Sequence, residues 1–293
     1  MNCGFVALIG QPNVGKSTLM NHLLGQKLSI TSRKPQTTRH RILGIDTNPK
    51  GQVIYLDTPG MHKGGKRALN RYLNRTADTA LMGVDAVVWL TDRLYWQDFD
   101  DAIIGKLQRA GLPVILAVNK VDRITARKEL LEFFAEAQKR FPFAHIVPIS
   151  ALKGNNLEKL KSLILELLPE GGLIYPEEQI TDRPERFLVA EIIREKLTRR
   201  MGQELPYALT VEIERYQELP AITRIYAIIW VERDTQKNMV IGKQGQLLKK
   251  VGSDARQDIQ KLLAQKVYLQ LWVKVKKGWS DNERALQSLG FNE

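Results

Sequence analysis

Short apolar runs alternate with amphipathic stretches along the first 170 residues of this chain of 293 residues. The apolar runs predict buried strands at residues 5–9, 51–56, 86–90, 114–118 and 146–149. The stretches between them have helical periodicity and predict helices at residues 16–25, 66–82, 98–110, 126–140 and 156–168. Residues 30–44 are polar and basic and predict a long loop. Strands that alternate with helices indicate an α/β domain with a mostly parallel sheet.

The pattern changes after residue 170. Residues 171–184 combine Gly, Pro and acidic residues without periodicity, which predicts a linker. The remaining pattern predicts, in order, a helix at 185–201, strands at 208–214 and 224–231, a helix–Gly-x-x-Gly–helix turn at 239–250, a helix at 253–264 and an alternating strand at 267–276. This order indicates a smaller α+β domain. We therefore expect domains at 1–170 and 185–278, the linker at 171–184 and a C-terminal tail at 279–293.

Composition narrows the class of protein. Apolar residues make up 43% of the chain and charged residues 26%, which is ordinary for a globular protein. No apolar run approaches the roughly 18 residues that a membrane span needs, and the first residues do not have the pattern of a signal peptide. The single cysteine, Cys3, excludes an internal disulfide, so we expect a cytoplasmic protein.

The net charge of +12 favours a polyanionic partner. Lysines and arginines are concentrated between residues 240 and 280, which favours a binding face in the second domain. A solvated lysine-rich surface is the alternative interpretation.

Residues 10–17, Gly-Gln-Pro-Asn-Val-Gly-Lys-Ser, match the phosphate-binding pattern G-x-x-x-x-G-K-[ST] between a predicted strand and a predicted helix. Glycines allow successive N–H groups to turn toward an anion, and the helix N-terminus adds partial positive charge. Lys16 is expected to contact the β- and γ-phosphates, and the Ser17 hydroxyl to bind Mg²⁺. The nucleotide-binding residues expected here are Gly10, Asn13, Val14, Gly15, Lys16, Ser17 and Thr18. An ordinary glycine-rich turn is the alternative.

Two further stretches suit a nucleotide switch. The polar loop contains Thr37 and Thr38, at a position where nucleotide switches bring a threonine hydroxyl to Mg²⁺. Asp57 and Gly60 belong to Asp-Thr-Pro-Gly at the end of a predicted strand, where a carboxylate holds Mg²⁺ through water and a glycine N–H reaches the γ-phosphate. Taken alone, either stretch is an ordinary loop. We expect Lys16, Thr38, Asp57 and Gly60 to be catalytic, with the metal held by Ser17, Thr38 and, through water, Asp57.

Asn119-Lys120-Val121-Asp122 follows the apolar strand 114–118 and identifies the base. A buried carboxylate at Asp122 accepts hydrogen bonds from guanine N1–H and the 2-amino group, and adenine would leave it unpaired. Asn119 is expected to bond the base and to tie the loops together, and the stem of Lys120 to lie over the ring. Ser150 and Ala151 end the next strand, where a backbone N–H is expected to reach guanine O6.

These five motifs, in this order and spacing, resemble those of the translation-factor-related GTPases. The wording Gly-x-Pro-Asn-Val-Gly-Lys-Ser at 10–17 and Gln-Thr-Thr-Arg-His at 36–40 resembles the Era GTPases in particular. The second half is similar to a type II K-homology (KH) domain, whose Gly-x-x-Gly loop brings single-stranded RNA close to helix N-termini. The RNA-binding residues expected are Ile241, Gly242, Lys243, Gln244, Gly245, Lys249, Arg256 and Trp279. For Trp279, and for Trp272 on the last strand, stacking on a base and internal packing both remain open.

The resemblance implies a P-loop GTPase domain followed by a type II KH domain, with GTP or GDP and Mg²⁺ as ligands. It also implies binding to the 3′ end of 16S rRNA, a role in 30S ribosomal subunit assembly and, in some members, peripheral association with the inner membrane. We expect a monomer and no DNA partner. The alternative is a nucleotide switch whose C-terminal domain binds a protein or a membrane instead of RNA.

One position departs from the pattern of regulatory GTPases. Met61 stands where many of them place a glutamine that orients the attacking water, and a methionine cannot do so. The resemblance implies that Asn13 matches an asparagine that binds K⁺ beside the phosphates. Simple capping of the loop is the alternative role for Asn13.

Overall fold

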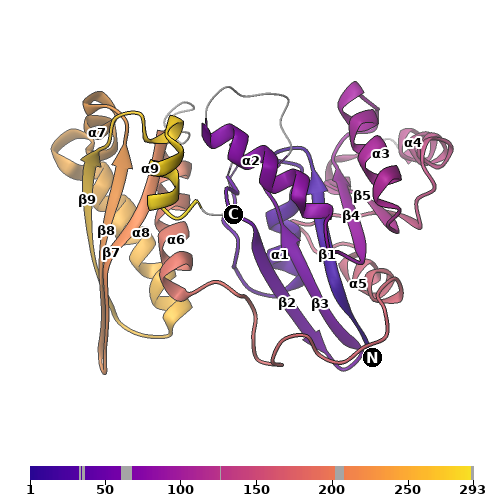
Figure 1. Ribbon diagram of the computed structural model, residues 1–293, viewed down its shortest axis with the longest axis horizontal. Coiled ribbons are helices and arrows are strands. Elements are labelled where there is room, and N and C mark those ends of the chain that lie inside the picture. Colours follow the sequence, from indigo (N-terminus) through magenta and orange to yellow (C-terminus); the bar gives the residue numbers. More distant parts are fainter. Residues whose placement is uncertain (33, 35–36, 61–67, 126, 202–207, 292–293) are drawn as a thin grey trace. The chain divides into compact units, whose positions relative to one another are not determined.

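The computed structural model describes residues 1–32, 34, 37–60, 68–125, 127–201 and 208–291, and the chain forms two compact units (Figure 1). The N-terminal unit comprises Met1–Ser29, Thr38–Gly65 and Leu73–Asp182. The C-terminal unit comprises Ile30–Thr37, Lys66–Tyr72 and Arg183–Glu293. Two short segments from the first half of the chain therefore belong to the C-terminal unit, which the contiguous boundaries expected from the sequence did not anticipate.

The N-terminal unit contains one six-stranded sheet, ordered β2-β3-β1-β4-β5-β6. Its strands are β1 (Asn2–Gly10), β2 (Ile42–Asn48), β3 (Gly51–Asp57), β4 (Ala86–Thr91), β5 (Val114–Val118) and β6 (His145–Pro148). All neighbouring strands are parallel except β2, which runs antiparallel to β3. The mostly parallel sheet is confirmed. The expected loop at 30–44 was too long, because its last residues begin the edge strand β2.

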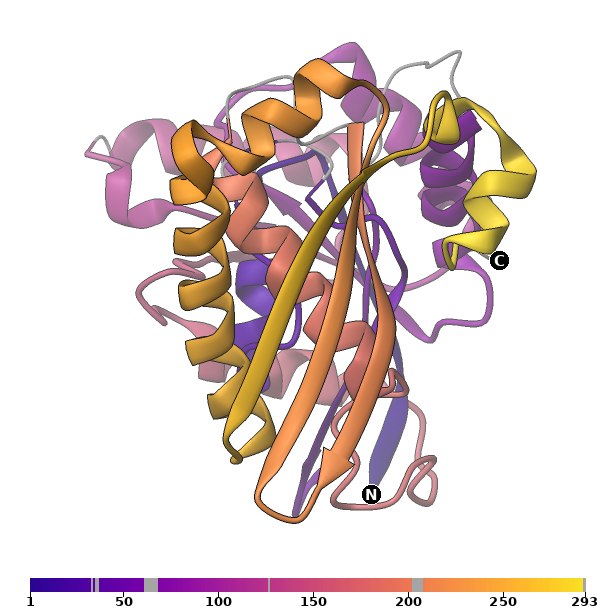
Figure 2. The same cartoon turned by 90° about the vertical axis from the view of Figure 1, so that its left-hand side faces the viewer.

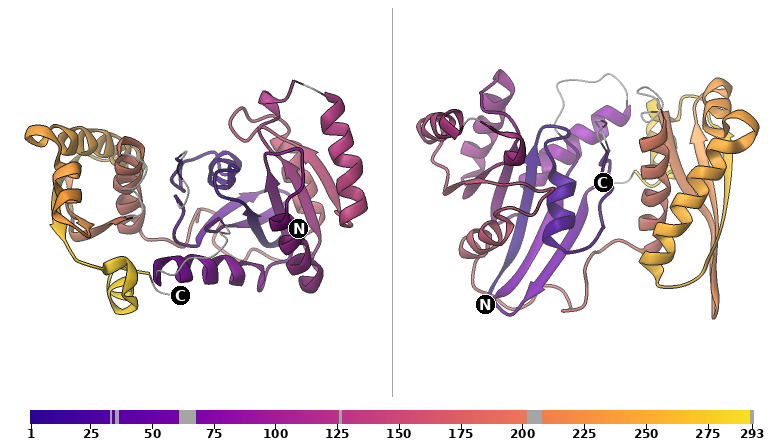
Figure 3. Two further views of the ribbon diagram at one scale, coloured as in Figure 1. Left: turned by 90° about the horizontal axis from the view of Figure 1, so that it is seen from above. Right: turned by 180° about the vertical axis from the view of Figure 1, so that it is seen from behind.

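Helices cover both faces of this sheet (Figure 3). They are α1 (Lys16–Leu23), α2 (Ala68–Asp78), α3 (Asp98–Ala110), α4 (Arg127–Arg140) and α5 (Leu157–Glu166), and short 3-10 turns lie at Thr79–Leu81 and Val121–Arg123. Ala7 and Ile9 of β1 pack in one core with side chains of α3 and α4. Val6 and Leu8 alternate with them and are also fully buried, on the opposite face, and α1 and α5 contact this part of the sheet. Burial on both faces explains why β1 is an almost uninterrupted apolar run.

The C-terminal unit has the predicted order of helix, two strands, two helices and strand. Its elements are α6 (Glu185–Arg200), β7 (Leu209–Leu219), β8 (Ile222–Val231), α7 (Asp234–Ile241), α8 (Gln246–Leu263), β9 (Val267–Val275) and α9 (Glu283–Ser288), with 3-10 turns at Lys243–Gly245 and Trp279–Asp281. Figure 2 shows the three strands side by side, with α6 behind them. β7 and β8 form an antiparallel hairpin, and β9 pairs parallel to β8.

The core of this unit lies between the three-stranded sheet and the helices α6 and α8, which pack against each other. Val189, Ile193 and Leu197 lie on one side of α6 and are fully buried in this core. Val251 and Ile259 do the same on α8. Residues four or eight positions apart share one face of a helix, so each set forms an apolar face, as the amphipathic pattern predicts.

The segment expected to be a free linker is partly anchored. Gln52 of β3 is fully buried, and its side-chain oxygen accepts hydrogen bonds from the N–H groups of Ile174 and Tyr175, each at 2.9 Å. The Gln52 amide group also donates to the Tyr175 carbonyl oxygen at 2.9 Å. The backbone N–H of Ile45 donates to the carbonyl oxygen of Ile180 at 2.9 Å. Backbone groups of this segment therefore complete the edge of the N-terminal sheet.

The C-terminal segment folds onto its own unit. Trp279 is fully buried, and its ring lies 6.1 Å from the ring of Phe291. In the part of the chain that the structure describes, no helix combines the length and the apolar character needed to cross a membrane.

Candidate functional site

The phosphate loop connects β1 to α1, as its sequence predicts. Gly15 has φ of 107°, and a Cβ at this position would lie 2.3 Å from the Nδ2 atom of Asn119. Only glycine satisfies both the backbone conformation and this close approach. The phosphate loop therefore lies in close contact with Asn119, the first residue of the Asn-Lys-Val-Asp motif, about a hundred residues later in the sequence.

The ammonium group of Lys16 lies inside this loop. Its Nζ donates to the carbonyl oxygens of Gly10 and Gln11, each at 3.0 Å, and the residue is 6% exposed. Burial lowers the pKa of Lys16 from 10.5 to about 8, although the Asp57 carboxylate acts in the opposite direction. Phosphate oxygens would supply the negative charge that this buried cation lacks.

The three expected metal ligands come together at the carboxyl end of β3. The Oγ atoms of Ser17 and Thr38 are 2.8 Å apart, and both hydroxyls donate to Oδ2 of Asp57, at 2.7 and 3.3 Å. Asp57 is fully buried, and its Oδ1 atom has no hydrogen-bond partner. Burial raises the pKa of the Asp57 carboxyl, against the opposing effects of the Ser17 hydrogen bond and the Lys16 charge.

This donor set fits Mg²⁺. A buried carboxylate oxygen without a partner, next to two hydroxyls, is a group of hard oxygen donors that a hard divalent cation prefers. Thr38, and not its neighbour Thr37, is at the site, because the Thr37 hydroxyl donates to the carbonyl oxygen of Lys34 at 2.6 Å.

Gly60 lies against the phosphate loop. A Cβ on Gly60 would meet the Cα of Pro12 at 2.9 Å, so its backbone approaches the loop more closely than a side chain would permit. Met61, which stands where many regulatory GTPases place a water-orienting glutamine, lies outside the described residues.

Asn119 joins three loops, as expected. Its side-chain amide donates to the carbonyl oxygen of Val14 at 2.7 Å, and its side-chain oxygen accepts from the N–H of Ala151 at 2.9 Å. Asn119 is 3% exposed. It therefore connects the phosphate loop, the base-recognition loop and the loop after β6.

Asp122 differs from expectation in its burial. Its side chain is exposed in this structure, whereas the sequence argument assumed a buried carboxylate. Ser150 donates a hydrogen bond to Oδ1 of Asp122 at 2.6 Å, and this bond lowers the pKa of the carboxyl. The assumption was wrong because this carboxylate projects from the short 3-10 turn after Lys120, beyond the packed end of β5. A base stacked on this turn would itself cover the carboxylate.

Two residues at this site were missed in the sequence. Asp92 forms an ion pair with Lys120, and Arg93 donates to the side-chain oxygen of Gln11. The Lys120 ammonium also donates to the carbonyl oxygen of Asn13 at 2.9 Å. Both missed residues directly follow β4, and their place at the carboxyl end of a parallel strand was the available signal.

The remaining loop residues have varied environments. Val14 is 2% exposed, and Thr18 is half-buried on the first turn of α1. Asn13 is exposed and has φ of 65°, a left-handed conformation that asparagine tolerates. This geometry is compatible with either proposed role of Asn13.

The Gly-x-x-Gly loop joins α7 to α8. Gly242 has φ of 72°, and a Cβ there would lie 2.6 Å from the Cβ of Leu247. Lys243 and Gln244 are exposed, and Gly245 immediately precedes α8. An exposed cation therefore sits at the N-terminus of a long helix, an arrangement suited to a phosphate backbone.

The other residues predicted to contact RNA differ in their exposure to solvent. Lys249 and Arg256 are exposed on α8, and Ile241 is half-buried next to the loop. Trp279 is fully buried, so its ring is not accessible to a base, and its environment fits the alternative role of anchoring the C-terminal segment. Trp272 on β9 is 51% exposed.

Both halves of the chain match known protein families. Residues 5–120 match a family described as "50S ribosome-binding GTPase", and residues 204–280 match the KH domain family. The chain is 56% identical over 291 residues to the GTPase Era of Pseudomonas savastanoi pv. phaseolicola, covering 99% of this chain and 97% of that protein. It is 54% identical over 291 residues to the GTPase Era of Marinobacter nauticus, covering 99% and 95%.

Two solved structures are similar over the full length of both chains, each with a TM-score of 0.96 and 40% identity. One is Era in complex with MgGDPNP and nucleotides 1506–1542 of 16S ribosomal RNA. The other is a single-residue variant of Aquifex aeolicus Era bound to GDP·AlF4⁻.

The lowered pKa of Lys16 predicts proton uptake when a nucleoside triphosphate binds. Phosphate oxygens stabilise the charged amine, so binding returns its pKa toward 10.5. With a pKa near 8 before binding, we expect uptake of about three-quarters of a proton at pH 8.5 and much less at pH 7.2. Calorimetry of GTP binding in two buffers of different ionisation enthalpy measures this. The same binding enthalpy in both buffers at pH 8.5 would contradict the assignment.

Proposed function

This chain belongs to the Era family of GTPases, and from this premise we propose that it couples its nucleotide state to binding of the 3′ end of 16S rRNA during maturation of the 30S subunit. As a member of that family it hydrolyses GTP to GDP and phosphate. One observation carries the proposal: a single chain contains both the oxygen cluster of Ser17, Thr38 and Asp57 and an exposed basic Gly-x-x-Gly loop. The Era complex with MgGDPNP and a fragment of that RNA supports it.

In the proposed mechanism the chain positions and neutralises the triphosphate. The Lys16 ammonium exchanges the carbonyl oxygens of Gly10 and Gln11 for phosphate oxygens. The loop N–H groups bind the remaining phosphate charge, and the Gly60 N–H meets the γ-phosphate. Ser17 and Thr38, and Asp57 through water, would hold Mg²⁺, which would supply further neutralisation of the developing charge.

For the base, we propose that the Asp122 carboxylate accepts from guanine N1–H and the 2-amino group. The Ala151 N–H, which donates to Asn119 in this structure, would turn to O6 on the same edge of the base. Asn119, Lys120 and Ser150 fix the loops. The hydrogen bond from the Asn119 amide to the carbonyl oxygen of Val14 supports this assignment, because it holds the base loop against the phosphate loop. The Ser150 hydroxyl supports it as well, since it orients the Asp122 carboxylate.

Asp122→Asn tests this assignment. The amide cannot accept both the N1–H and the 2-amino hydrogen bonds, whereas xanthine presents a carbonyl in place of the amine. We expect the affinity for GTP to fall by about 100-fold, because hydrogen bonds to a charged acceptor are lost. Affinity for XTP should rise at the same time, which serves as the control for folding. Retention of the preference for GTP would refute the role of Asp122.

We further propose that K⁺ assists hydrolysis beside Asn13. The resemblance to K⁺-binding GTPases and the exposed side chain of Asn13 support this. Because methionine at position 61 offers no group to orient water, a cation near the phosphates would supply transition-state charge stabilisation.

Turnover of GTP in K⁺ and in Na⁺ at equal ionic strength measures the effect. We expect faster turnover in K⁺, and loss of the difference in Asn13→Ala. Equal rates of the wild-type protein in both salts would exclude the K⁺ site.

We propose that residues 1–170 are the GTP-binding domain, 171–184 the linker, 185–278 the type II KH domain and 279–293 a C-terminal tail. The protein acts as a cytoplasmic monomer that binds no DNA and associates peripherally with the inner membrane. The order of elements in residues 185–278 supports the boundaries of the RNA-binding domain.

The RNA-binding face is proposed to consist of Ile241, Gly242, Lys243, Gln244, Gly245, Lys249 and Arg256. Lys243→Gln removes one charge at the loop, so we expect weaker binding of a synthetic RNA with the 16S 3′-end sequence and a salt slope lower by about one. Gly242→Asp should abolish binding, because it adds a clashing Cβ and a negative charge. Lys261→Gln, at the far end of α8, is the matched control.

Fluorescence anisotropy over a range of salt concentrations provides the measurement. Equal weakening by Lys243→Gln and Lys261→Gln would mean that the loop is not the contact. Absence of salt-dependent RNA binding by the wild-type chain would favour a protein or membrane partner.

A further inference from the structure

Helix α6 buries a polar side as well as an apolar side. Its polar residues at the spacing i, i+3, i+4 and i+7 share one side of the helix, and none is more than 5% exposed. They are Glu191, Arg194, Glu195 and Thr198. Charged residues are almost never buried without partners. Some other part of the chain must therefore satisfy this side of α6.

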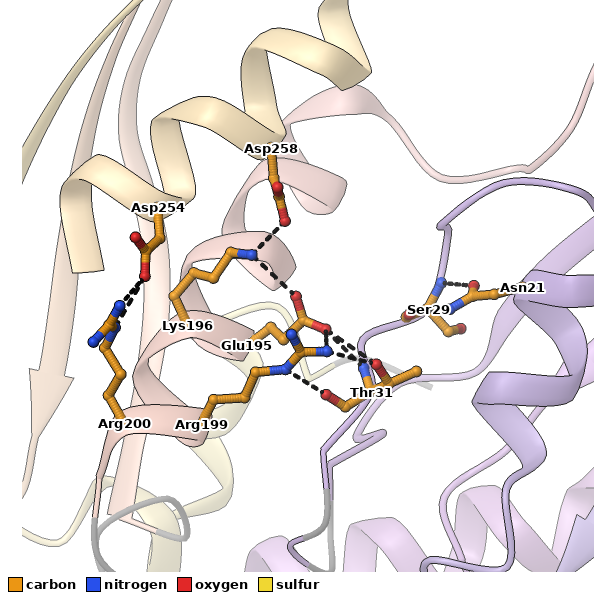
Figure 4. A network of polar contacts seen from close by, with 9 residues as sticks. All are labelled: Asn21, Ser29, Thr31, Glu195, Lys196, Arg199, Arg200, Asp254 and Asp258. Carbon is orange, nitrogen blue, oxygen red and sulfur yellow. Dashed lines mark hydrogen bonds and ion pairs between the residues drawn. The ribbon is translucent and has the colours of Figure 1, made fainter. Parts of the chain in front are cut away.

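Residues 30–37 supply those partners. This segment belongs to the same compact unit as α6, although its neighbours on both sides belong to the N-terminal unit. Oε1 of Glu195 accepts hydrogen bonds from the N–H of Thr31 at 3.0 Å and from its hydroxyl at 3.3 Å (Figure 4). Arg199 donates to the carbonyl and hydroxyl oxygens of Thr31 at 3.0 and 2.8 Å. All three polar groups of Thr31 are thus bound by α6.

The other end of the segment is held by the same helix. Arg194 donates to the carbonyl oxygen of Thr37. Its guanidinium is held by two further hydrogen bonds to the Glu191 carboxylate, at 2.7 and 2.6 Å. Between the two ends, the Lys34 ammonium donates to the carbonyl oxygen of Thr198 at 2.5 Å. The segment is therefore held on α6 at its beginning, middle and end.

The segment ends directly beside the proposed metal ligand. Thr37, bound by Arg194, is joined by one peptide bond to Thr38, whose hydroxyl lies 2.8 Å from that of Ser17. Consecutive Cα atoms are about 3.8 Å apart, so a displacement of Thr37 cannot leave Thr38 unaffected. Thr37, which Arg194 binds, and Thr38, the proposed Mg²⁺ ligand, are therefore linked by one peptide bond.

On its other side, Glu195 is connected to the RNA-binding helix. Oε2 of Glu195 lies 3.8 Å from the Lys196 ammonium, which also pairs with Asp258 of α8 (Figure 4). Helix α8 begins immediately after Gly245 of the Gly-x-x-Gly loop. A separate pair, Arg200 with Asp254, also joins α6 to α8, and within the described residues it is not bonded to Thr31.

We propose that the polar side of α6 is the receptor through which the nucleotide state reaches the RNA-binding helix, with Glu195 and Arg194 as positioning residues. The proposal rests on the proposed function, because it specifies how that coupling is carried. With Mg²⁺ and GTP bound, Thr38 is held at the metal and the contacts of Thr31, Lys34 and Thr37 with α6 remain. When the γ-phosphate is lost, Thr38 is released and the segment leaves Glu195 without the Thr31 donors. Lys196, shared between Glu195 and Asp258, reports this change to α8.

The coupling must be reciprocal. If the GTP-bound metal site favours the docked segment and the docked segment favours RNA binding, then RNA must raise the affinity for the GTP form by the same factor. Measured couplings of this kind are about 5- to 150-fold. Removing the docking contacts should bring the factor close to one, without removing either binding site.

The test compares two docking variants with one control in the full chain. Glu195→Gln keeps the shape but removes the charge that faces Thr31 and Lys196. Thr31→Val keeps shape and backbone N–H but removes the hydroxyl, and it carries the test if burial makes Glu195→Gln unstable. Arg200→Gln breaks the parallel pair between α6 and α8 and should leave docking intact.

For each protein, the affinity for a non-hydrolysable GTP analogue with Mg²⁺ is measured with and without saturating RNA of the 16S 3′-end sequence. Hydrogen exchange of the amide at residue 31 gives a second readout that does not depend on activity. We expect a coupling factor of at least about fivefold in the wild-type protein and in Arg200→Gln, and a factor near one in both docking variants. The amide should exchange slowly with the analogue bound and faster with GDP, and fast in Glu195→Gln in both states.

The outcomes distinguish a failure of the proposed role of α6 from a failure of the proposed function. Unchanged coupling in the docking variants, with coupling present in the wild-type protein, overturns the role of α6 and leaves the proposed function standing. Absence of RNA binding or of coupling in the wild-type protein overturns both.

Discussion

The burial of charge is the constraint on which this structure depends. Lys16, Asp57 and Glu195 are each at most 6% exposed. Removing a charge from water is costly unless hydrogen bonds or opposite charges compensate for it. Each of these buried charges therefore needs partners, and in the proposed function one partner of each is exchanged during the nucleotide cycle. For Lys16 and Asp57 the proposed partner is phosphate and metal, and for Glu195 it is Thr31 of the chain itself.

This arrangement gives the molecule a fixed cradle and an exchangeable contact. The cradle includes the phosphate loop and the base loops, tied together by the Asn119 side chain and by the close approach of Gly15. The proposed exchangeable contact is made by Thr31, Lys34 and Thr37, whose compact unit differs from that of the chain on either side of Ile30–Thr37. A binding site with a fixed cradle and one exchangeable ligand, Thr38, is what a nucleotide switch requires.

The sequence predicted the architecture well because the relevant signals are local. Alternating strands and helices, the glycine loop and the Asn-Lys-Val-Asp stretch depend on periodicity and short spacing, and the structure has them where they were expected. Strand β2 was missed because it forms an edge of the sheet and follows a basic loop without a turn signal. The burial of Asp122 was misjudged because exposure depends on the tertiary surroundings of a short turn. Trp279 was left with two possible roles, since alternation along a strand says nothing of a tail that folds back. The buried polar side of α6 could not be predicted, because its partners lie more than 150 residues away in the sequence. The apolar residues of α6 already matched the amphipathic pattern, in which polar residues face solvent.

The central claim is that one chain couples guanine nucleotide to RNA. The most direct measurement is the affinity of the full chain for an RNA with the 16S 3′-end sequence, in the presence of Mg²⁺ and either a non-hydrolysable GTP analogue or GDP. We expect affinities for the RNA that differ by at least about fivefold between the two nucleotides, a coupling in the ordinary allosteric range. Equal affinities for the RNA in the two nucleotide states would contradict it.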